Sequence, residues 1–152
     1  MAITAERIIE AEPDVVFDII TDIDGLPGWN DIMRRVVEAP SELGDGSQWV
    51  VEFDALGQTW LSRSTVVTID RAARRFDYRS VTDDGNPSYA EWAWTVTPSA
   101  PGCVVSVTAD LHPITFWRRV LLVHVRSRQL RRTEIPGSLE RLARAVATAQ
   151  VP

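Results

Sequence analysis

The chain has 152 residues, a length typical of one domain, and its apolar fraction of 45% and charged fraction of 24% exclude long disordered stretches. Its formal net charge of −5 argues against a general nucleic-acid binder. The first residues lack the basic start and apolar core of a signal peptide, and no apolar run is long enough to span a bilayer. With one cysteine, Cys103, no intramolecular disulfide can form, so we expect a cytoplasmic protein.

The N-terminal part predicts a strand followed by a short helix. Residues 3–10 alternate between apolar and polar side chains, as a strand does. Pro13 suits the first turn of a helix, where its missing N–H needs no partner, and Asp14 suits the positive end of the helix dipole. Apolar residues at helical spacing continue the helix to Thr21, and a segment rich in glycine and proline ends it before Trp29.

The middle of the chain predicts an antiparallel meander, because alternating segments follow one another with short turns between them. The predicted strands cover residues 47–54, 59–69, 76–81, 90–96 and 103–110. Trp49 and Val51 share one strand face, and Trp92 and Trp94 share another. The strand at 59–69 has two mixed faces, so the pattern leaves open which of its side chains point inward.

The C-terminal part predicts helix, first over residues 113–132 and then along a stripe spaced four, three and four residues apart. The stripe consists of Ile135, Leu139, Leu142 and Val146. Pro136 lies between the two segments, and an interior proline costs a helix roughly 3 kcal/mol, so we expect a kink or break just before it. One helix cannot cover the face of a sheet of six or seven strands, so the elements leave space between helix and sheet.

Three motifs, in this order and spacing, resemble the START-like superfamily, also called helix-grip, Bet v 1-like or SRPBCC. Residues 9–22 resemble its opening with the sequence IEAEPDVVFDIITD, and Pro27 and Trp29 stand where that opening has a proline and a tryptophan. Residues 44–49, GDGSQW, resemble the start of its third strand. Residues 135–142, IPGSLERL, resemble the terminal helix of its bacterial polyketide cyclase/dehydrase branch.

The resemblance implies one START-like ligand-binding domain over residues 1–152, of the α+β class. Its helix-grip fold would be a curved antiparallel sheet of about six to seven strands around a long C-terminal helix, with two short helices after the first strand. Such a fold encloses a deep cavity. Members include polyketide aromatase/cyclases, lipid and sterol carriers, quinone-binding chaperones and plant hormone receptors, so the fold alone does not define the function.

Six tryptophans are many for a chain of this length, and several fall on faces expected to point inward. They either fill an ordinary core or, as a set, form flat walls for a planar or polyene ligand. Inward hydroxyls could orient a ligand carbonyl or simply satisfy the backbone. The predicted cavity residues are Trp29, Met33, Trp49, Val51, Trp60, Ser62, Ser64, Tyr78, Trp92, Trp94 and Glu134.

The resemblance also shows one departure. Aromatase/cyclases of the superfamily place an arginine and a tyrosine in the cavity, and the corresponding positions here hold Ser64 and Met33. Catalytic residues are therefore not assigned. Glu134 or Asp54 could act as an acid or base if buried, because desolvation would raise the pKa of the carboxyl group, or each could be a solvated surface group.

A cluster of arginines lies in a segment without acidic residues, and it could be a solvated helix face or a docking surface. As a docking surface it would suit an acyl carrier protein, a phosphopantetheine or coenzyme A phosphate, or an anionic membrane. Its members are Arg118, Arg119, Arg126, Arg128, Arg131 and Arg132. His112 and His124 have no ligands at metal-binding spacing, so neither a metal nor another cofactor is expected.

The leading hypothesis is therefore a protein that binds a small hydrophobic, aromatic or polyketide-like ligand in an internal cavity. As an enzyme it would be a cofactor-free polyketide cyclase or dehydrase, acting by holding a flexible chain in one conformation. The alternative is a non-catalytic carrier or sensor for a lipid or quinone. A third reading is an interaction protein whose cavity is vestigial.

Overall fold

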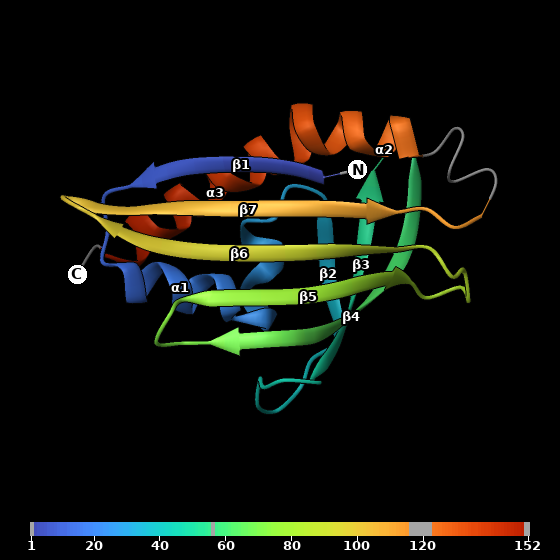
Figure 1. Cartoon of the computed structure of the whole chain (residues 1–152), viewed down its shortest axis with the longest axis horizontal. Coiled ribbons are helices and arrows are strands. Elements are labelled where there is room, and N and C mark those ends of the chain that lie inside the picture. Colours follow the sequence, from blue (N-terminus) through green and yellow to red (C-terminus); the bar gives the residue numbers. More distant parts are fainter. Residues whose placement is uncertain (1, 56, 116–122, 151–152) are drawn as a thin grey trace.

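The computed structural model describes residues 2–55, 57–115 and 123–150, and its seven strands form one antiparallel sheet with the order β1-β7-β6-β5-β4-β3-β2 (Figure 1). The strands are β1 (Ala2–Ile9), β2 (Met33–Glu38), β3 (Gln48–Ala55), β4 (Gln58–Asp70), β5 (Arg75–Thr82), β6 (Tyr89–Ser99) and β7 (Gly102–His112). The helical elements are α1 (Pro13–Thr21), the 3₁₀ helix η1 (Ile23–Gly28), α2 (Val123–Gln129), the π-helical turn η3 (Leu130–Glu134) and α3 (Ile135–Ala149).

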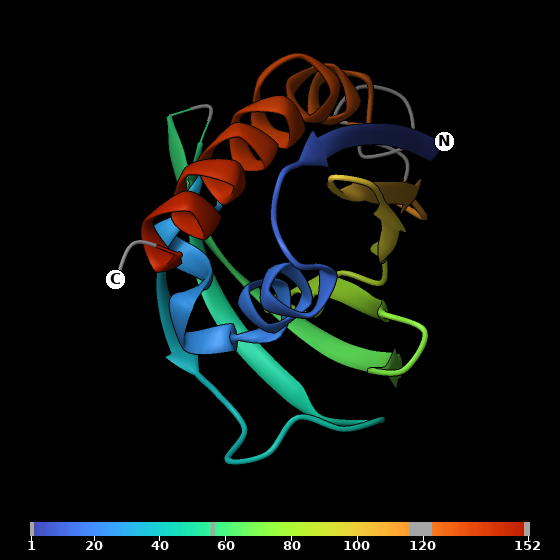
Figure 2. The ribbon, with the colours of Figure 1, turned by 90° about the vertical axis from the view of Figure 1, so that its left-hand side faces the viewer.

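The curved sheet wraps around α3, and α1 and η1 lie on the same concave side (Figure 2). The predicted α+β helix-grip architecture, with two short helices after the first strand, is therefore confirmed. Each strand predicted from alternation is present, with ends shifted by a few residues. The helix beginning at Pro13 also ends at Thr21, as its apolar spacing predicts.

Strand β2 is the element that the sequence pattern did not reveal. Its residues do not alternate, because Arg34 and Arg35 are adjacent and Val36 and Val37 follow them. The pairing of β2 with β3 contains two register shifts, one near each end of the strand. Such irregularities remove the period of two by which a strand is recognised.

The C-terminal helical segment departs from a regular α-helix directly before Pro136. In the π-helical turn η3 the N–H of Ile135 donates to the carbonyl of Leu130, five residues earlier. Pro136 occupies the first turn of α3 directly after η3, and its missing N–H removes one helical hydrogen bond where the winding is already widened. The predicted interruption is thus a widened turn rather than a break. Residues 113–115, predicted as helix, are not helical, and residues 116–122 lie outside the described residues.

The apolar stripe of α3 faces the sheet, as its spacing predicts. Ile135, Leu139, Leu142 and Val146 are all at most 4% exposed. Helix α1 buries Val16, Phe17 and Ile20 against the same core. Burying each such side chain contributes about 1.5–3 kcal/mol, so the two helices are held mainly by these faces. Arg141 adds a hydrogen bond of 3.0 Å from Nη1 to the carbonyl of Asn30 and thereby joins α3 to the end of η1.

Candidate functional site

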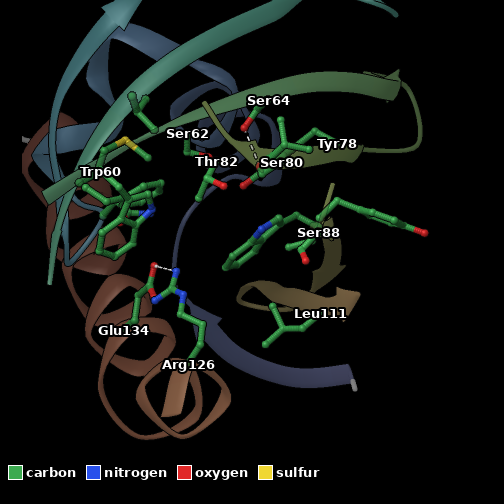
Figure 3. Close-up of a pocket in the computed structure, with 18 of the residues that line it drawn as sticks. Trp60, Ser62, Ser64, Tyr78, Ser80, Thr82, Ser88, Leu111, Arg126 and Glu134 are labelled. Carbon is green, nitrogen blue, oxygen red and sulfur yellow. Dashed lines mark hydrogen bonds and ion pairs between the residues drawn. The ribbon is translucent and has the colours of Figure 1, made fainter. Parts of the chain in front are cut away.

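A cavity of about 370 Å³ lies between the concave face of the sheet, η1 and the helical segment α2–η3 (Figure 3). All eleven residues predicted for the cavity line it. Most of its wall is apolar or aromatic, and Val125, which is 43% exposed, lies at its rim. Small-molecule sites in proteins have this size and character.

Four aromatic side chains pack against one another and are nearly inaccessible to solvent; we call Trp29, Trp49, Phe76 and Trp94 the inner aromatic group. The rings of Trp29 and Trp94 meet edge to face at 5.5 Å, and those of Trp49 and Phe76 stack at 5.8 Å. The sequence left open whether the tryptophans fill an ordinary core or form the walls of a cavity. The side chains of the inner aromatic group do both.

Three further rings form a more accessible wall; we call Phe53, Trp60 and Trp92 the outer aromatic wall. Phe53 and Trp60 stack with their centroids 5.5 Å apart. Trp92 lies nearly parallel to Tyr78, with an interplanar angle of 14° and a separation of 6.2 Å. These rings are only partly buried, because the space beside them is the cavity itself.

Hydroxyl groups from two neighbouring strands line one side of the cavity (Figure 3). We call Ser62 and Ser64 of β4 with Ser80 and Thr82 of β5 the hydroxyl row. Antiparallel register places Ser64 beside Ser80 and Ser62 beside Thr82, and the hydroxyl oxygens of Ser64 and Ser80 are 2.6 Å apart. The row shows which residues of β4 face inward, a question that the mixed pattern of residues 59–69 could not decide.

An ion pair projects into the cavity opposite the hydroxyl row (Figure 3). Glu134, the last residue of η3, is 2% exposed. Arg126 Nη2 donates to Glu134 Oε1 at 3.3 Å, while Nη1 donates to Glu134 Oε2 and to Gln129 Oε1. Burial raises the pKa of Glu134, and the positive charge of Arg126 opposes that rise. The pair is thus a charged group in an otherwise largely apolar cavity, and π-helical turns often occur at functional sites.

Tyr78 lies between the two aromatic sets and contributes a neutral phenol. Its hydroxyl oxygen accepts a hydrogen bond of 3.2 Å from Trp94 Nε1. Burial raises the pKa of Tyr78 above its ordinary value, and the nearby charge of Glu134 acts in the same direction. The phenol therefore stays protonated at neutral pH and keeps a proton to donate.

The arginines predicted to form one docking surface lie in different places. Arg126 faces the cavity, because it lies one helical turn before the buried Leu130 and on the same side of the helix. Arg128 lies on the opposite side of α2. Arg118 and Arg119 lie outside the described residues. We call the remaining exposed residues, Arg128, Arg131 and Arg132, the exposed arginine patch; none of them forms an ion pair with a described residue.

Asp54, the second carboxylate considered as an acid or base, does not reach the cavity. Asp54 is 53% exposed and lies 3.8 Å from Arg34, so it is a surface carboxylate outside the cavity. The described residues contain no cluster of side chains that could hold a metal ion. The described helices include none long and apolar enough to cross a membrane.

The sequence did not indicate that Arg126 and Thr82 belong to the cavity. Thr82 lies one strand position beyond the predicted end of β5, on the same face as Ser80. Arg126, Leu130 and Glu134 are spaced four residues apart, and that spacing is the signal that could have joined Arg126 to Glu134.

This fold and its cavity define a helix-grip protein of the kind that binds small ligands. The chain belongs to the family described as polyketide cyclase/dehydrase and lipid transport, whose model matches residues 1–147. No curated protein matches the sequence.

Solved structures show the same fold at low sequence identity. The protein TTHA0849 from Thermus thermophilus has a TM-score of 0.80 and 20% identity, covering 99% of this chain and 100% of the other. Ara h 8.0201 has a TM-score of 0.74 and 16% identity, with 97% and 98% covered. A Thalictrum norcoclaurine synthase mutant bound to a transition-state analogue has a TM-score of 0.73 and 13% identity, with 99% and 96% covered. At these identities the likeness extends to the fold alone.

Proposed function

We propose that the chain binds a small hydrophobic ligand, aromatic or polyketide-like, in the cavity between sheet and helix. The observation that supports this most strongly is a space of about 370 Å³ whose aromatic walls also present the hydroxyl row and the Arg126–Glu134 pair. Desolvating two charges is costly, so a buried ion pair that faces a cavity favours a binding site over an ordinary core.

The outer aromatic wall favours a flat ligand. Trp60 and Trp92 offer large ring faces to the cavity, and aromatic rings attract one another at centroid separations of roughly 4.5–7 Å. The hydroxyl row and Arg126 provide directional contacts for ligand oxygens. A polyketide-like or other oxygenated aromatic molecule has this combination of a flat apolar body and polar oxygens.

Two roles follow from such binding. The catalytic role is cofactor-free cyclisation or dehydration of a polyketide-like chain, with the walls folding the chain and Glu134 exchanging protons with it. Arg126 would then supply, from helix α2, the cavity arginine that Ser64 cannot provide. The alternative role is a non-catalytic carrier or sensor for a lipid or quinone, acting in the cytoplasm.

The first experiment is native mass spectrometry of freshly purified protein, which identifies any co-purified small molecule. Tryptophan fluorescence during titration with polyaromatic compounds then measures binding. We expect quenching or a spectral shift in the wild-type protein, and at least roughly tenfold weaker binding in Trp92→Ala, which removes one ring of the outer aromatic wall. Val67→Ala is the matched control, since Val67 is 57% exposed on the other face of β4. The absence of any response across a broad hydrophobic panel would contradict the proposal.

The exposed arginine patch supports docking to an anionic partner, because three cations without ion pairs to described residues are close together on a chain whose net charge is −5. We propose an anionic membrane surface or an acyl carrier protein as that partner. Co-sedimentation with phosphatidylglycerol vesicles and binding of a carrier protein distinguish them. The variant Arg131→Ala with Arg132→Ala should lose salt-sensitive binding, whereas Arg34→Ala with Arg35→Ala, which changes the net charge equally on β2, should retain it. Equal losses in both double variants would contradict a specific patch.

A further inference from the structure

Two side chains of the cavity wall keep a hydrogen-bonding group that no described residue uses. The Nε of Arg126 has no acceptor among the described residues, since only Nη1 and Nη2 are engaged. Ser62 is 5% exposed, lines the cavity and has no hydrogen-bond partner in the described part of the chain, so its hydroxyl can donate or accept. Trp29 Nε1 is also unpaired, but it is enclosed by protein and a ligand cannot reach it. A ligand oxygen in the cavity can therefore accept from Arg126 and Ser62.

The Glu134 carboxylate, which faces the same space, is already engaged, because both of its oxygens accept from Arg126. The hydroxyl of Tyr78 accepts from Trp94 and keeps its own proton to donate. The guanidinium of Arg126 and the hydroxyls of Tyr78 and Ser62 are therefore donors that line the cavity, and a ligand with acceptor oxygens complements them.

Charge balance decides what happens when such a ligand is an anion. Four groups face or lie near Glu134: Arg126 and Gln129 from α2, Asp31 from the loop before β2, and Tyr78 from β5. Arg126 and Glu134 neutralise each other, so an added anion would leave an uncompensated negative charge in a site shielded from water. The carboxylate of Asp31 destabilises that state further by repulsion. Two anions that share one buried site are relieved when one of them binds a proton.

We propose that the ligand carries a carboxylate or enolate oxygen that binds Arg126, and that Glu134 takes up one proton from solvent when this ligand binds. This inference rests on the proposed function and adds the chemical class of the ligand. No covalent bond of the ligand changes in this step. The proton adds to one oxygen of the Glu134 carboxylate, which frees N–H groups of Arg126 for the ligand oxyanion. The resulting carboxylic acid can itself donate to that oxyanion.

Two probes of equal shape test the inference: 2-naphthoate, an anion, and 2-naphthamide, which is neutral. Isothermal titration at pH 7.5 in buffers of different ionisation enthalpy measures protons exchanged on binding. We expect 2-naphthoate to bind at least about tenfold more tightly and to take up about one proton, and 2-naphthamide to take up none. Because a proton is taken up, the affinity for 2-naphthoate should fall by up to about tenfold for each pH unit raised, while that for 2-naphthamide should not change.

Substitutions test whether Glu134 is the group that takes up the proton and whether Arg126 is the group that contacts the oxyanion. Glu134→Gln should bind 2-naphthoate without proton uptake, whereas Glu140→Gln, the same change at an exposed ion pair on α3, should behave as the wild-type protein. Arg126→Met should bind both probes equally. Equal affinities of the wild-type protein for the two probes, or proton uptake that persists in Glu134→Gln, would overturn the inference while leaving the proposed function intact. If neither probe binds, the result would count against both the inference and the proposed function.

Discussion

The inner aromatic group is built differently from the two polar parts of the cavity wall, the hydroxyl row and the ion pair opposite it. The inner rings contact one another, so removing a ring leaves a hole in a packed core. The hydroxyls and the guanidinium face the cavity, where a ligand can reach them. Side chains of the first kind should control stability, and side chains of the second kind should control binding.

The largest effect on stability is expected for Trp49→Ala. The indole of Trp49 is 2% exposed and packs against Phe76 and Tyr78, so its loss leaves a cavity in the core. We expect a loss of about 3–5 kcal/mol in the free energy of unfolding, measured by urea denaturation. A loss below about 1 kcal/mol would show that the inner aromatic group is not a packed core.

Arg126→Met should give the next largest effect, because it leaves the Glu134 carboxyl buried without its cation. We expect a loss of up to about 3 kcal/mol at neutral pH. The pKa of Glu134 would then lie further above its unfolded value, near 4.3, so the folded state binds the extra proton. Stability of the variant should therefore fall as the pH rises above that value and recover in acid. A deficit that does not change with pH would contradict burial of the carboxyl.

Trp92→Ala should separate binding from stability. Its ring is partly exposed to the cavity, so we expect a stability loss well below that of Trp49→Ala, by about half or more. Ligand binding measured by fluorescence of the remaining tryptophans should nevertheless weaken strongly. If the two variants lost equal stability, the distinction between inner and outer rings would disappear.

Ser62→Ala is expected to be the smallest change in stability, within about 0.5 kcal/mol, because its hydroxyl has no partner among the described residues to lose. Affinity for an oxygenated ligand should fall by roughly threefold to tenfold, the value of one ordinary hydrogen bond. Ser47→Ala is a useful contrast, since the Ser47 hydroxyl accepts from the N–H of Gly44 at 2.9 Å in a turn outside the cavity. That variant should lose stability and keep its affinity.

Much of the sheet was predictable because alternation has a period of two that local sequence carries. Trp49, Trp92 and Trp94 were placed inward by that period alone. Strand β2 could not be predicted in this way, because its register shifts remove the alternation. The pattern of β4 was ambiguous because Ser62 and Ser64 occupy inward positions where a strand in an apolar core would carry apolar residues.

The helical part of the site was harder to predict. A continuous helix over residues 113–132 placed all its arginines on one surface, whereas the structure separates Arg126 from Arg128, Arg131 and Arg132. Which side of a helix becomes buried depends on contacts with distant strands, and these do not follow from local spacing. The existence of the cavity also depends on α1 and η1 filling only part of the concave face.

The π-helical turn before Pro136 has a consequence for how this protein can vary. Because its hydrogen bond spans five residues instead of four, a π turn takes up one extra residue while the helical segments on either side keep nearly the same phase. Deleting one residue between Leu130 and Glu134 would therefore restore regular winding and leave α2 and α3 facing as before. Arg126 and Glu134 would then be seven residues apart instead of eight, about two regular turns, and would still lie on one side of the helix. Aligned relatives should therefore be compared by the length of this turn as well as by the amino acids at these two positions.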